Sequence, residues 1–283
     1  MQESFNKVTL VGKVSEITYR KDVNKNKDNY VAGEIKIETG EDNIIPVSFY
    51  QNELTKDGKP NGIYASLMTV IEEFKTIAKD GREAADTVSV TTGKLEENSF
   101  YGKDGNLIRQ YRISSPFFNR KSGAEPANEF VVEGIVVNTS DEIKNDVPTG
   151  RLFVDLLVVG YGDRGNILRL VVEGEKGVDY IKSSVSERDE VKFAGQVLHS
   201  ETNEQVKEEV AFGEPIIRII TRTEKKLLIT SATAARESTA SPEEIDTILA
   251  DREGRLKVAK EKAESKVKKE ETKTTSTRGN FSL

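Results

Sequence analysis

Basic and aromatic side chains alternate in two segments of the first half of the chain. One segment follows the first predicted strand, at residues 19–30, and the other surrounds a turn at 100–109. Cations neutralise phosphates and flat rings stack on unpaired bases, so both kinds of side chain suit a single-stranded nucleic acid. Five further candidates lie at outward positions of predicted strands. The candidate nucleic-acid-binding residues are Lys13, Tyr19, Arg20, Lys21, Tyr30, Lys36, Tyr50, Lys94, Phe100, Tyr101, Arg109 and Arg112.

The residues that usually carry catalysis are scarce. The chain has no cysteine and a single histidine, His199, which has no catalytic partner at any motif spacing and is expected at the surface. The glycines of GYGDRGN at 160–166 lie between two predicted strands, so they indicate a hairpin turn rather than a phosphate-binding loop. No two acidic motifs are spaced for a pair of metal ions. The sequence therefore predicts no enzyme, no metal and no cofactor.

Length and composition limit the class of protein. A chain of 283 residues favours two domains. No apolar run is long enough to span a membrane, and the N-terminus lacks the pattern of a signal peptide. These features, with the absence of cysteine, predict a cytoplasmic location without membrane contact.

Charge and aromatic residues are distributed unevenly along the chain. The net charge is −6, yet residues 1–124 hold 18 Lys+Arg and 18 Asp+Glu, whereas residues 125–240 hold 14 and 21. Twelve of the nineteen Phe and Tyr residues lie in the first 120. We therefore expect the first half to carry most of the binding.

Hydrophobic periodicity predicts the elements of the first half. Strand patterns cover 5–17, 30–39 and 42–50, a helical pattern covers 62–79, and strand patterns return at 87–97 and 106–118. Phe49, Phe74 and Tyr111 fall at core-facing positions. Three strands, a helix and two strands are the order of an OB-fold, a five-stranded Greek-key barrel.

The second half repeats this plan. FVVEGIVV at 130–137 resembles KVTLVGKV at 7–14, with Gly134 in the place of Gly12. The predicted fold is mainly β, with two tandem OB-folds, a C-terminal helix and a flexible tail. The boundaries are 1–120 for the first OB-fold, 121–128 for a linker, 129–236 for the second OB-fold, 237–270 for the helix and 271–283 for a disordered tail.

Two segments carry a resemblance to a known family. FNKVTLVGKVSEI at 5–17 resembles the opening of single-stranded DNA-binding proteins, and KLEENSFYGKDGNLIRQYRISS at 94–115 resembles their last hairpin. Tandem barrels with a tail are similar to the larger proteins of this kind from some bacteriophages. The resemblance implies protection of single-stranded DNA in replication or recombination, a backbone contact from Lys13 and base stacking by aromatic residues. The chain departs from the family in having no tryptophan, no acidic tail and an acidic second half.

Other interpretations remain open. A viral structural or assembly protein could use OB barrels as oligomerisation modules, and an RNA-binding OB protein is a third possibility. Homo-oligomers are compatible with each. The chain ends in two apolar side chains, Phe281 and Leu283, after a polar spacer. Such an end can dock replication or recombination proteins, can contact DNA or the acidic second barrel, or can be an end without a function.

Overall fold

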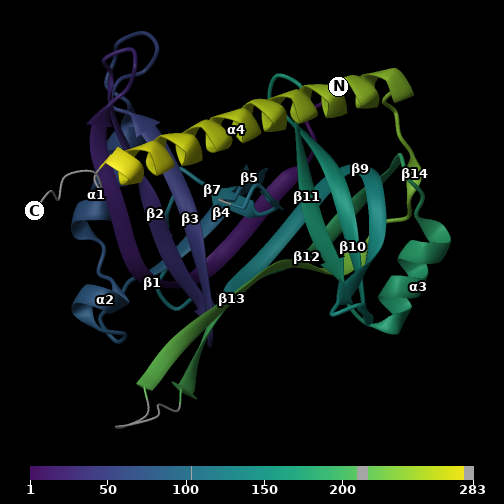
Figure 1. Ribbon diagram of the computed structural model, residues 1–283. Coiled ribbons are helices and arrows are strands. Elements are labelled where there is room, and N and C mark those ends of the chain that lie inside the picture. The colour runs from purple at the N-terminus through teal and green to yellow at the C-terminus, as the bar shows by residue number, and fades with distance from the viewer. Residues whose placement is uncertain (103, 209–215, 277–283) are drawn as a thin grey trace, which may run out of the picture.

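The computed structural model describes residues 1–102, 104–208 and 216–276, so Phe281 and Leu283 lie outside the described residues. It consists of two β-barrels side by side with a long helix lying across them (Figure 1). Within the described residues, no helix is long and apolar enough to cross a membrane.

The first barrel has the strand order of an OB-fold. Neighbours around the barrel are β1, β2, β3, β7 and β4, and β4 closes it by pairing with β1. The pair β3–β7 is parallel and the others are antiparallel. Helix α1 lies between β3 and β4 in sequence, as the periodicity predicts. The elements are β1 (Asn6–Val23), β2 (Asn29–Gly40), β3 (Asn43–Asn52), α1 (Gly62–Glu73), α2 (Ile77–Asp80), β4 (Thr87–Glu97), β5 (Phe100–Tyr101), β6 (Leu107–Ile108), β7 (Tyr111–Ser114) and β8 (Asn119–Arg120).

The second barrel repeats this topology and confirms the predicted fold class. Its strand order is β9, β10, β11, β13 and β12, with β12 closing onto β9 and a parallel pair β11–β13. Its elements are β9 (Ala127–Lys144), β10 (Val147–Gly160), β11 (Arg164–Val172), α3 (Glu175–Ser184), β12 (Asp189–Glu208), β13 (Ile216–Ala232) and β14 (Arg236–Glu237), followed by α4 (Pro242–Ser276).

Equivalent glycines explain why the two first strands look alike in sequence. A Cβ on Gly12 would lie 2.1 Å from the carbonyl oxygen of Glu38, and a Cβ on Gly134 would lie 2.4 Å from that of Leu157. Each glycine lets the bent first strand approach the second strand of its own barrel. The internal repeat therefore has a steric cause.

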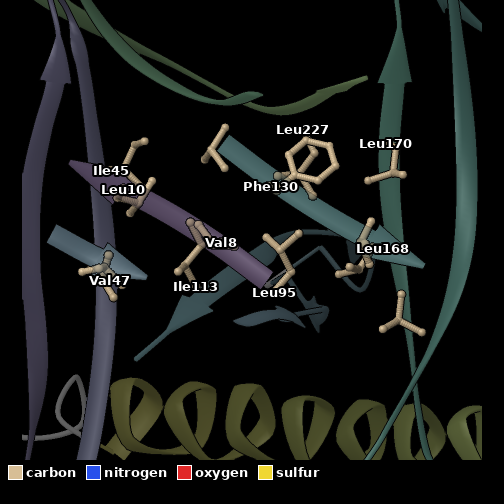
Figure 2. Packing of buried hydrophobic residues seen from close by; sticks show 14 of the residues in the cluster. Val8, Leu10, Ile45, Val47, Leu95, Ile113, Phe130, Leu168, Leu170 and Leu227 are labelled. Carbon is tan, nitrogen blue, oxygen red and sulfur yellow. The ribbon is translucent and has the colours of Figure 1, made fainter. Parts of the chain in front are cut away.

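The two barrels form one continuous β-structure. Residues Asn6–Val11 of β1 pair antiparallel with Ala127–Val132 of β9. Val8 and Leu10 of β1 belong to the same buried cluster as Phe130 of β9 and Leu170 of β11, as Figure 2 shows. Residues 121–128, expected to be a linker, thus lead directly into the strand that joins the barrels.

The helical pattern at 62–79 is interrupted in the structure. Helix α1 ends at Glu73, because Phe74 is extended (φ −77°, ψ 133°) and the Lys75 N–H bonds to Asp86 Oδ2 at 2.8 Å. Thr76 then caps α2, since its hydroxyl accepts from the Lys79 N–H. One amphipathic helix over 62–79 was therefore a wrong prediction, although Leu67, Val70 and Ile71 are buried as expected.

Helix α4 connects the two barrels on one side. Its first turns bury Ile245 and Ile248 against Ile135, Leu157 and Val159 of the second barrel. Further along, it contacts β11 and then β5 of the first barrel. The structure gives this helix the bounds Pro242–Ser276, whereas the sequence suggested 237–270.

Candidate nucleic-acid interface

A shallow hollow of about 520 Å³ lies on the outer surface of β1, β2 and β3 in the first barrel. Arg20, Ala32 and Tyr50 stand opposite one another on these three strands, so a small side chain separates a cation from an aromatic ring. Tyr19 lines the same hollow, and Tyr19 and Tyr50 are 50% and 49% exposed. Two open rings and a guanidinium therefore border one surface.

Tyr50 is supported from one side by Tyr30. Their ring centroids are 4.9 Å apart, and Tyr30 is buried. The Tyr50 hydroxyl also donates to Asn52 Oδ1 at 2.9 Å, which fixes the ring further. Tyr30, a predicted binding residue, thus orients Tyr50 rather than offering an open face of its own.

A larger hollow of about 840 Å³ lies on the second barrel. Its floor is formed by alternate residues of β10 and β11, whose other residues point into the core. Six cationic and three acidic side chains line it: Arg109, Lys144, Arg151, Arg169, Lys225 and Lys226, with Glu142, Asp155 and Glu224. Although residues 125–240 are acidic as a whole, this surface is basic.

A buried carboxylate holds two of these arginines. Asp155 is 4% exposed and accepts from Arg169 Nε and Nη2 at 2.8 Å each, and from Arg109 Nη1 at 3.2 Å. The Arg169 guanidinium also lies 4.9 Å from the centre of the Phe153 ring. One carboxylate for two guanidinium groups leaves a net positive charge in a fixed position, with one arginine from each barrel.

A small hollow of about 110 Å³, which we call the junction, shares lining residues with each of the two larger ones. Ser48 and Arg112 line both this junction and the first-barrel hollow. Gln110, Tyr111 and Lys225 line both the junction and the second-barrel hollow. The three hollows therefore adjoin one another across both barrels, and together we call them the trough. Lys225 is exposed, and within the described residues it has no ion-pair partner.

Hydrogen bonds from β3 and β7 to β12 fix the junction. The Asn43 side chain accepts from the His199 N–H at 2.7 Å and donates to the Val197 carbonyl oxygen at 3.2 Å. The Tyr111 hydroxyl donates to the Leu198 carbonyl oxygen at 3.3 Å. Burial raises the pKa of Tyr111, so this hydroxyl keeps its proton.

His199 is buried in this junction, so the expectation of a surface histidine was wrong. It continues the inward alternation of Val191, Phe193 and Val197 on β12. Its Nε2 has no hydrogen-bond partner within the described residues. Burial, with the nearby charges of Lys225 and Lys36, lowers the pKa of His199 to about 4.

This pKa predicts a pH dependence of stability. The unfolded chain takes up a proton near pH 6.5, whereas the folded chain does so only near pH 4. The free energy of unfolding should therefore fall as the pH decreases through this window, by about 2 to 3 kcal/mol. His199→Gln should remove that part of the slope in urea titrations at a series of pH values. Equal slopes for the two proteins would contradict a buried neutral histidine.

The other predicted binding residues lie in different places. Lys13 donates to the Arg82 carbonyl oxygen beside α2, and Lys94 pairs with Glu3 at 2.8 Å near the N-terminus. Lys21 approaches Glu72 of α1 at 4.0 Å, and Lys36 pairs with Glu16 at 2.9 Å. Of these four, none lines the trough. Arg112 does, and pairs there with Glu96.

The β5–β6 hairpin contacts α4. Phe100 is 42% exposed, whereas Tyr101 is half-buried and the centre of its ring lies 5.8 Å from Lys260 Nζ of α4. Of the two adjacent aromatic residues, Phe100 is the one with an open ring. Arg109 follows the hairpin and reaches the second-barrel hollow.

Sequence reasoning missed the cations of the second barrel. Arg151, Arg169, Lys225 and Lys226 were treated as part of an acidic half. The available signal was strand alternation: Leu168, Leu170 and Val172 are buried, so Arg169 between them must face outward.

Comparisons with known proteins agree with this architecture. The model of the YorF family matches residues 4–270. The chain is similar to the wild-type single-stranded DNA-binding protein from Thermus aquaticus, with a TM-score of 0.50, 12% identity, and coverage of 85% of this chain and 97% of that chain. A deletion mutant of that protein gives a TM-score of 0.47 with 14% identity, covering 86% and 100% of the two chains. A comparison with curated proteins gave no match. At such identities the likeness establishes the fold.

Proposed function

This chain belongs to the YorF family, and we propose that it binds single-stranded DNA along the trough without catalysing a reaction. The observation that carries this proposal is the continuity of exposed tyrosines and arginines across both barrels. The Thermus aquaticus structure of similar fold is that of a single-stranded DNA-binding protein, which is consistent with the proposal.

The two hollows offer complementary contacts. Tyr19 and Tyr50 present ring faces on which bases can stack, and every base has such a face, so the binding tolerates any sequence. Arg20 and Arg112 lie beside these tyrosines, where their guanidinium groups can bind the phosphates. The second barrel contributes mainly charge, through Arg151, Arg169 and Lys225. A strand crossing the junction would thus pass from a stacking surface to an electrostatic one.

Such a protein would cover single strands exposed during replication or recombination. A duplex hides the base faces that the tyrosines require. We therefore propose protection of single strands rather than recognition of a sequence. The C-terminal residues Phe281 and Leu283 remain our candidates for docking partner proteins.

Fluorescence anisotropy with labelled DNA of about 30 nucleotides, long enough for two OB barrels, tests the proposal. Affinity for the single strand should exceed that for the same sequence as duplex by at least about tenfold, the equivalent of one stacked base. The affinity for an RNA of the same sequence shows whether binding depends on the sugar. Equal affinity for single strand and duplex, or no binding at low salt, would overturn the proposal, and self-association without binding would favour the assembly role.

The salt dependence of binding should separate Arg20 from its neighbour Lys21. Four to six phosphate contacts predict a slope of log affinity against log salt of about −3 to −4. Arg20→Ala should flatten the slope by about 0.7, because Arg20 lines the trough. Lys21→Ala should leave it unchanged, because Lys21 lies near Glu72. The same change in both variants would show that the trough does not define the path of the DNA.

A further inference from the structure

One buried side chain of the junction has a polar atom without a partner. His199 of β12 lines this hollow and is 6% exposed. Its Nε2 atom has no hydrogen-bond partner within the described residues. Buried polar side-chain atoms in folded proteins almost always form a hydrogen bond, because an unpaired one costs free energy. Nε2 is therefore a candidate contact for a ligand that enters the junction.

Cationic side chains from both barrels surround His199. Arg112 of β7 and Lys225 of β13 line the same hollow, and Lys36 of β2 is close enough for its charge to lower the pKa of His199. Glu34 of β2 is the carboxylate among the described residues that line the hollow. The lining of the junction therefore carries more positive than negative charge while the imidazole is neutral.

Carboxylates compensate these cations to different degrees. Lys36 pairs with Glu16, and Arg112 pairs with Glu96. A guanidinium has more N–H donors than one such pair uses, so Arg112 retains donors for an anion. Lys225 is exposed, and within the part of the chain that the structure describes it forms no ion pair. Its charge is thus the one with the least compensation.

The size and polarity of the junction suit a phosphate group. Its volume of about 110 Å³ equals the share of about four water molecules in the liquid, which is too little for a base with its sugar. Ser48, Asn98 and Gln110 also line it, so hydroxyl and amide groups can donate hydrogen bonds beside the two cations. Because the junction shares lining residues with both larger hollows, a strand that follows the trough passes it.

We propose that the junction binds one backbone phosphate of the single strand between Arg112 and Lys225, and that His199 takes up a proton from the solvent when this phosphate binds. This inference rests on the proposed function and adds a proton to the binding reaction. The negative charge of the phosphate offsets the charges of Lys225 and Lys36, and a phosphate oxygen offers the protonated Nε2 an acceptor.

Proton uptake makes the affinity depend on pH. In the free protein, burial and the charges of Lys225 and Lys36 lower the pKa of His199 to about 4, so the imidazole is neutral at neutral pH. A bound phosphate should return this pKa to about its ordinary value of 6.5. The affinity for single-stranded DNA should then rise about tenfold as the pH falls from about 7.5 to about 5.5.

Nuclear magnetic resonance of the full-length protein measures this proton directly, because the chain has a single histidine. The pKa of His199 should rise from about 4 to about 6.5 when single-stranded DNA of about 30 nucleotides is added. Lys225→Gln should remove most of the difference between the free and the bound pKa. Lys144→Gln is the matched control, since Lys144 lines the second-barrel hollow but not the junction, and it should preserve that difference.

Fluorescence anisotropy at the two pH values gives the second measurement. His199→Gln should reduce the tenfold pH effect to less than about twofold, although it retains Glu34 and every other titratable group of the junction. An unchanged His199 pKa in the complex, or an equal pH effect in His199→Gln, would overturn the inference while leaving DNA binding established. A rise caused by millimolar inorganic phosphate but not by DNA would also overturn it, because the junction would then bind a free anion. Absence of binding by the unmodified protein at both pH values would instead reject the proposed function.

Discussion

Glu97→Gln should lower the free energy of unfolding by about 3 kcal/mol, because it leaves a buried arginine without its charge partner. The side chains of Glu97 and Arg252 are each 9% exposed. Glu97 Oε2 accepts from Arg252 Nε at 2.7 Å and from the Ile167 N–H at 3.0 Å, so one carboxylate joins β4, β11 and α4. Urea unfolding measures the loss, and unfolding in the variant should begin with release of α4 from the barrels.

The adjacent Glu96 provides a matched control on the same strand. It pairs with Arg112, and these two side chains are 36% and 49% exposed. Glu96→Gln should therefore cost no more than about 1 kcal/mol. Combining Glu97→Gln with Arg252→Met should recover part of the loss, because no unpaired charge then remains. If Glu96→Gln and Glu97→Gln lower the free energy of unfolding equally, the buried pair stabilises the protein no more than the exposed pair does.

The Glu97–Arg252 pair also makes the free energy of unfolding depend on pH, in a different pH range from His199. Burial by itself would raise the pKa of Glu97, but hydrogen bonds from Arg252, Ile167 and Ser99 together hold this pKa below its usual value. The resulting stability is present above pH 4.5 and is lost as the pH falls through the lowered folded-state pKa. The histidine acts between pH 6.5 and about 4, so the two contributions appear in succession.

The barrels could be predicted from sequence because their signals are local. Alternation of Val8, Leu10 and Val14 defines the inner face of β1, and Gly12 marks the place where β2 approaches. The same signals recur around Gly134. Pairing of β1 with β9 left no local signal, because it joins segments about 120 residues apart through their backbones. A linker was therefore expected where the two barrels in fact become continuous.

The binding surface was only partly predictable for a geometric reason. A period of two tells whether a side chain points into or out of a barrel, but it does not tell in which direction around a closed barrel it points. Lys13, Lys94 and Tyr50 were all expected to point outward, yet only Tyr50 lines the trough. The net charge of residues 125–240 is a sum over all surfaces of the second barrel. It therefore gave no indication of the basic surface that contains Arg151 and Arg169.

Tyr19→Ala combined with Tyr50→Ala should produce the largest loss of affinity for single-stranded DNA. Each stacked base contributes about 1–3 kcal/mol, so losing two rings should weaken binding by at least about thirtyfold. Both rings are half-exposed and line the same hollow, and Tyr30 holds Tyr50 in place from one side. Neither substitution changes the charge, so the slope of log affinity against log salt should stay constant while the affinity falls.

Two comparisons decide whether this loss comes from stacking. The double change Tyr19→Phe with Tyr50→Phe keeps both rings and should keep most of the affinity, although it removes the Tyr50–Asn52 hydrogen bond. Tyr161 is 92% exposed but lies outside the trough, so Tyr161→Ala should leave the affinity within about twofold. If the phenylalanine variant binds as weakly as the alanine variant, the hydroxyls and not the rings make the contact. If Tyr161→Ala weakens binding as much as the double alanine variant does, the rings of the trough are no more important than a ring outside it. The DNA then follows another path, over the β10–β11 turn.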